Sequence, residues 1–132
     1  MIEVPVSWGE LIDKITILEI KSERIADEAK RANVERELIL LTERRKPVEN
    51  HEAVRAITAE LRAVNTALWE IEDDIRDCER AGDFGSRFIE LARSVYITND
   101  RRADLKREIN SALGSAIVEE KSYKPYTVEK AS

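Results

Sequence analysis

The most regular pattern in the chain is an apolar stripe in its middle, whose members are spaced alternately by three and four residues. The stripe consists of Val54, Ile57, Leu61, Val64, Leu68, Ile71, Ile75 and Cys78. This spacing places apolar side chains along one face of an α-helix and is typical of a coiled-coil seam. It predicts one long helix that starts after Pro47 and ends near Gly82, because glycine suits a left-handed cap.

A further helix is predicted from about residue 86 to residue 113, between a short turn and Gly114. Its inward stripe consists of Phe88, Leu91, Val95, Ile109 and Leu113. Because the turn is short, the two long helices should pack as an antiparallel hairpin. The segment from Tyr96 to Asp100 contains β-branched residues and good cap formers, which leaves open a helix break near Thr98 to Asp100.

Two shorter helices are predicted upstream. Ser7 and Glu10 form a capping box for a helix that starts near Trp8. Its apolar residues point in nearly all directions around the axis, so this helix should lie at the centre of a bundle or in a subunit interface. Asp27 can cap the next helix, which should run to about Arg45 before Pro47 interrupts it.

The composition agrees with a compact helical protein. The chain has 132 residues, of which 42% are apolar and 37% charged, with only four glycines. This length suffices for one hydrophobic core. The prediction is an all-α antiparallel bundle of about four helices, with residues 1–122 as a single domain. Pro125 should prevent a helix near the end, so residues 123–132 are predicted to be a mobile tail.

Charge and residue counts exclude several classes of partner and site. The net charge of −5 disfavours nucleic acid, because phosphate binding needs a basic face. No apolar run approaches the roughly 18 residues of a membrane span, and the first residues do not resemble a signal peptide. We therefore expect no membrane contact and a cytoplasmic location. One cysteine and one histidine cannot provide an internal disulfide or a two-histidine metal site.

Polar residues interrupt the inward stripe of the last helix, namely Asn99, Arg102 and Lys106. Buried cations without partners would cost several kcal/mol each, so they require carboxylates, an anion or water. Asp13 and Glu19 on the first helix are candidate partners. Either these five residues form an ion network that fixes helix register, or they form a pocket for a small anionic ligand with a phosphate or carboxylate group.

Acidic pairs offer a second candidate site. Glu49 and Glu52 followed by Glu70 and Asp73 resemble the Glu-x-x-Glu and Glu-x-x-Asp spacing of the all-α nucleotide pyrophosphohydrolases. That resemblance implies Mg²⁺ held by the four carboxylates. The alternative is a solvated helix face, because a chain with nineteen Glu and eight Asp contains such spacings by chance. Apart from the Mg²⁺ of this second candidate site, no cofactor is predicted.

Three segments resemble an uncharacterised bacterial family of short all-helical proteins. They are residues 4–21, the sequence from Asn99 to Ala103 and the sequence from Glu119 to Tyr123. The resemblance covers most of the chain. It implies a helical fold and brings no activity, cofactor or catalytic residue.

Three functions follow from these patterns. The first is a non-enzymatic helical interaction or scaffold module that self-associates or docks a protein partner, because the first helix is apolar all round and the seam is long. The second is a small-ligand or enzyme site built from Asp13, Glu19, Asn99, Arg102 and Lys106. The third is Mg²⁺-dependent nucleotide hydrolysis. We expect a binding protein rather than an enzyme.

Overall fold

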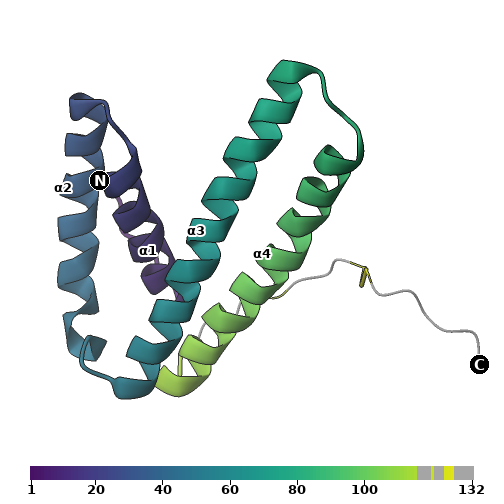
Figure 1. Cartoon of the computed structure of the whole chain (residues 1–132). Coiled ribbons are helices and arrows are strands. Elements are labelled where there is room, and N and C mark those ends of the chain that lie inside the picture. The colour runs from purple at the N-terminus through teal and green to yellow at the C-terminus, as the bar shows by residue number, and fades with distance from the viewer. Residues whose placement is uncertain (116–119, 121–123, 127–132) are drawn as a thin grey trace, which may run out of the picture.

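The fold consists of helices joined by short turns. In a computed structural model that describes residues 1–115, 120 and 124–126, the chain forms four α-helices and one short 3₁₀ helix (Figure 1). They are α1 (Trp8–Arg24), α2 (Glu28–Arg45), η1 (Lys46–Val48), α3 (Glu52–Ala81) and α4 (Ser86–Leu113). The predicted all-α class and the long α3–α4 hairpin are confirmed.

The helix ends follow the local chemistry of the sequence. The Ser7 hydroxyl accepts the backbone N–H of Glu10 at 3.1 Å and starts α1. Asp27 caps α2 by accepting the N–H of Lys30 at 2.9 Å. At the other ends, Gly82 after α3 and Gly114 after α4 adopt φ angles of 65° and 63°. This is the left-handed conformation that glycine adopts without steric penalty.

Helix α4 runs without a break through Thr98, Asn99 and Asp100. The break that the sequence left open is therefore absent. Packing of α4 against α3 outweighs the weak helix propensity of these residues. As a result, Asn99, Arg102 and Lys106 share one face of a continuous helix.

The helices form two hairpins, α1–α2 and α3–α4, which diverge from each other in Figure 1. Helix α1 contacts each of the other three α-helices, and four of its apolar residues are buried: Ile12, Ile15, Leu18 and Ile20. Helix α2 packs against α1 and contains no buried residue. The prediction of a central first helix is thus confirmed.

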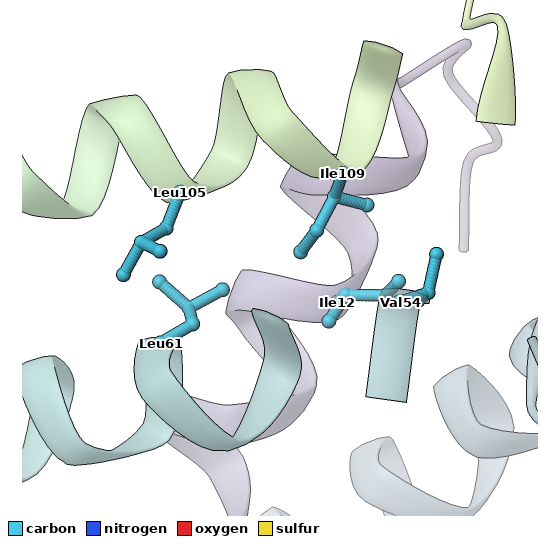
Figure 2. Packing of buried hydrophobic residues seen from close by; sticks show 5 residues of the cluster. All are labelled: Ile12, Val54, Leu61, Leu105 and Ile109. Carbon is cyan, nitrogen blue, oxygen red and sulfur yellow. The ribbon is translucent and has the colours of Figure 1, made fainter. Parts of the chain in front are cut away.

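The hydrophobic core lies where α1 crosses the α3–α4 hairpin. Its buried members, each at most 3% exposed, are Ile12, Val54, Leu61, Leu105 and Ile109 (Figure 2). Gly9 allows α1 to approach α4 closely. A Cβ atom at this position would lie 2.4 Å from the backbone oxygen of Lys106, inside van der Waals contact. The core therefore occupies only one end of the long hairpin.

Two predictions concern parts of the chain outside the core. Within the described helices, none is both long and apolar enough to cross a membrane. The predicted mobile tail, residues 123–132, lies outside the described residues except for residues 124–126. Tyr126 places its ring 5.3 Å from that of Tyr96 on α4.

Candidate functional site

A buried ion pair joins α1 to α4. The Asp13 side chain is 1% exposed, and Arg102 approaches it from α4 with two donors. The Nε of Arg102 donates to Oδ1 at 2.9 Å, and its Nη2 donates to Oδ2 at 2.5 Å. This bidentate geometry is among the strongest that a carboxylate can form, and it compensates much of the desolvation of Asp13.

Helix α3 adds a third partner to the same carboxylate. The Nδ2 atom of buried Asn65 donates to Asp13 Oδ1 at 2.9 Å and to the Thr16 hydroxyl at 2.8 Å. Thr16 in turn donates to the backbone oxygen of Asp13 at 2.7 Å. The Asp13 carboxylate thus accepts hydrogen bonds from both α3 and α4 and joins three helices.

A second polar layer lies one turn closer to the start of α1. Lys106, which is 8% exposed, donates from Nζ to Glu10 Oε2 at 2.7 Å. Asn110 accepts the backbone N–H of Gly9 at 2.7 Å. Both contacts join α1 to α4, so Arg102, Lys106 and Asn110 on the inner face of α4 are matched to groups on α1.

The structure divides the five predicted ligand-site residues among different contacts. Asp13 and Arg102 come together, whereas Lys106 pairs with Glu10, which was assigned only a capping role. Glu19 accepts from Arg62 Nη1 at 3.0 Å on the partly exposed edge between α1 and α3. Asn99 lies half-buried on α4. The Asp13–Arg102 and Glu10–Lys106 contacts match the geometry of an ion network that fixes helix register.

Four residues of this network were missed from the sequence, namely Glu10, Thr16, Asn65 and Asn110. Asn65 lies four residues after Leu61, so it shares the apolar face of α3. Asn65 interrupts the apolar stripe of α3 as Asn99 interrupts that of α4, so the same pattern could have identified it. Glu10 could have been identified as a partner for Lys106 because the pairing needs only that α1 and α4 run side by side at their ends.

The four carboxylates of the proposed Mg²⁺ site are not brought together. Glu49 follows η1 and Glu52 opens α3, but Glu70 comes eighteen residues after Glu52 on the same straight helix. At about 1.5 Å per residue this separates them by roughly 27 Å, and Asp73 is farther still. In the part of the chain that the structure describes, no three His, Cys, Asp or Glu side chains gather as metal ligands.

The α3–α4 hairpin continues beyond the end of α1, whose last residue, Arg24, pairs with Glu70 at 3.2 Å (Figure 1). We call residues 68–97 the distal hairpin. Its seam is half-buried at Leu68, Ile71, Ile75, Phe88, Leu91 and Val95, and buried at Cys78. Further apolar side chains are exposed, namely Phe84 at 54%, Ile89 at 55%, Tyr96 at 43% and Ile97 at 44%. Two helices alone cannot bury such a seam.

The two helices of the hairpin carry opposite charge. Helix α3 has eight acidic and four basic residues, whereas α4 has six basic and four acidic residues. The acidic excess of α3 lies in its distal half. This half contains six acidic residues and only two basic residues, Arg76 and Arg80. Within residues 68–97, α4 contributes Arg87, Arg93 and Glu90, and Arg87 already lies 4.0 Å from Asp74 of α3.

Comparison with known proteins identifies the family and no activity. No curated protein and no solved structure matches this chain. The model of a family of unknown function, DUF6165, matches residues 2–131. This match spans nearly the whole chain, including all four α-helices, so the protein belongs to the family of unknown function DUF6165.

Proposed function

We propose that this protein is a non-enzymatic helical interaction module that pairs with a second copy of itself through the distal hairpin. The observation that carries the proposal is the seam of residues 68–97, which is half-buried at every named member except Cys78 and continues beyond the core cluster. Covering such a seam releases ordered water from apolar surface and is the main driving force for helix association.

The charge pattern favours a second copy as the occupant. In a two-fold arrangement, α3 of one copy lies against α4 of the other, and each contact occurs twice. The acidic distal half of α3 then faces Arg87 and Arg93 of α4 at both positions. Arg93 on α4 is exposed and has no ion pair within residues 1–115, so it is available to the acidic face of a partner α3.

A ligand site around Asp13 receives less support. Its two oxygens accept three hydrogen bonds from Asn65 and Arg102, and the carboxylate is 1% exposed. A ligand would have to displace Arg102 from a bidentate pair, which would leave a buried charge uncompensated. A cytoplasmic location and a bacterial source stay predictions.

Light scattering on the purified chain tests the proposal with matched variants. Wild type is expected at twice the chain mass of 15.1 kDa. Ile89→Glu and Ile97→Glu introduce a charge into the distal hairpin and should give folded monomers by circular dichroism. Ile39→Glu, at a position 70% exposed on α2, is the control and should stay dimeric.

Three results would contradict the proposal. One is a wild-type monomer across the micromolar range. Another is a dimer that persists in both distal variants. The third is a dimer lost only in Ile39→Glu, which would place the interface on α2 and would fit docking through the other hairpin.

A further inference from the structure

The side of α4 opposite its seam carries an exposed apolar stripe. Ile89, Tyr96 and Ile97 are 55%, 43% and 44% exposed. At about 100° per residue they lie on one side of the helix together with Arg93, roughly opposite the residues of the seam. We call these four residues the outer face of α4. The contact between α3 and α4 leaves this face open.

One residue from the C-terminal part of the chain lies against this face. The ring of Tyr126 is 5.3 Å from that of Tyr96, and the two ring planes are tilted by 46°. This distance falls within the range of about 4.5–7 Å in which aromatic rings attract each other. Residues 124–126 form neither helix nor strand, and Pro125 favours an extended backbone at Lys124. A non-helical segment thus places an aromatic side chain on the outer face.

The chain between α4 and Tyr126 is long enough for this contact to form within one molecule. Helix α4 ends at Leu113, seventeen residues after Tyr96, so its end lies about 26 Å from Tyr96 along the helix axis. Eleven peptide links separate Ser115 from Tyr126, and such a stretch spans at most about 36–40 Å. No second copy is therefore needed to bring Tyr126 to Tyr96.

The contact between the two rings is weak. Tyr96 remains 43% exposed and Tyr126 53% exposed, so each ring keeps much of its surface in water. A single aromatic pair favours the closed arrangement by a factor of only about 2–10. A partner helix with a larger apolar surface can therefore displace Tyr126.

We propose that residues 124–126, which we call the C-terminal strap, cover the outer face of α4 in the monomer and compete there with a second copy of the chain. The inference rests on the self-association proposed above, in which Ile89 and Ile97 of this face contact the partner. A molecule with a closed strap cannot present Tyr96 to a partner, so the apparent dissociation constant is multiplied by the inverse of the open fraction. Two copies must open for one dimer, so this factor enters twice.

Sedimentation velocity on three full-length proteins tests the strap. Tyr126→Ala removes the ring and should lower the dissociation constant of the dimer about tenfold or more, because both copies are then open. Tyr126→Phe keeps the ring and should behave like wild type. In wild type, nuclear Overhauser contacts between the rings of Tyr96 and Tyr126 should weaken as the protein concentration rises through the dissociation constant.

The outcomes separate the strap from the dimer itself. An equal dissociation constant in wild type and Tyr126→Ala would overturn the strap and leave self-association intact. A higher dissociation constant in Tyr126→Ala would place Tyr126 within the dimer interface and would overturn the strap as well. If none of the three proteins dimerises in the micromolar range, both proposals fail.

Discussion

Arg102 of α4 and Asp13 of α1 form a bidentate ion pair whose carboxylate is 1% exposed, although the two residues are 89 positions apart in the chain. Asn65 of α3 donates to the same carboxylate. Three helices therefore meet at one charged group. We therefore expect the relative register of these helices to depend on this ion pair.

Removal of one partner should reveal this dependence. Asp13→Ala leaves Arg102 and Asn65 without their acceptor, and we expect it to lower the free energy of unfolding by about 3 kcal/mol. The Arg102 side chain is 29% exposed and can be partly hydrated. Arg102→Ala should therefore lower the free energy of unfolding by less than the loss of one partner from a fully buried pair would. Urea denaturation of both single variants and the double variant gives the coupling energy.

The matched control for this cycle is the exposed pair of Arg44 and Glu3, whose side chains are 71% and 83% exposed. Its removal should change stability by less than about 1 kcal/mol. Equal effects for the exposed and the buried pair would contradict the structural role of Asp13.

Gly9 should tolerate no side chain. A Cβ atom there would lie 2.4 Å from the backbone oxygen of Lys106 and 2.9 Å from Asn110 Oδ1, so α1 must move away from α4. We expect Gly9→Ala to destabilise the protein by about 2 kcal/mol, although alanine favours an isolated helix by about 1 kcal/mol.

Gly85→Ala serves as the comparison for Gly9. At Gly85 the nearest atom to an added Cβ is a flexible Asp83 oxygen at 3.3 Å. Thermal unfolding should show a change of less than about 1 kcal/mol there. A neutral Gly9→Ala would show that the close contact between α1 and α4 is not required.

The two halves of the apolar seam should differ in their contribution to the stability of the monomer. Leu61 is 0% exposed in the core, whereas Leu68 in the distal hairpin is half-buried. We expect Leu61→Ala to cost about 3 kcal/mol and Leu68→Ala about half of that in dilute solution. At concentrations that favour the dimer, the cost of Leu68→Ala should rise. A cost that stays independent of concentration would indicate that Leu68 is not covered by a partner.

Salt should weaken self-association. In the proposed interface, the acidic distal half of α3 attracts Arg87 and Arg93 on α4 of the other copy. Raising ionic strength from about 0.1 M to about 1 M shortens the Debye length from about 10 Å to about 3 Å, which screens exposed charges. Sedimentation velocity should therefore show a higher dissociation constant at high salt. A lower one would indicate an interface held by apolar contacts without charge complementarity.

Local patterns were sufficient to predict the helices and the hairpin. Ser7, Asp27, Gly82 and Gly114 marked helix ends because capping is a short-range interaction, and the seam from Val54 to Cys78 follows from helical periodicity. Polar residues within an apolar stripe likewise pointed to the Asp13–Arg102 contact.

Contacts between distant segments were not predictable from spacing. Arg62 of α3 reaches Glu19 and Glu23 of α1, and no motif relates their positions. The Mg²⁺ hypothesis was wrong because sequence spacing alone did not show that Glu52 and Glu70 lie far apart. Their spacing looked informative, but one unbroken helix holds them apart.

Isotope-filtered nuclear Overhauser measurements on a mixture of labelled and unlabelled protein test the central claim most directly. The account predicts contacts between copies at the methyl groups of Ile75, Ile89 and Leu91 in the distal hairpin, and none at Ile39 on α2. The absence of such contacts at concentrations where sedimentation shows a dimer, or contacts confined to α2, would contradict it.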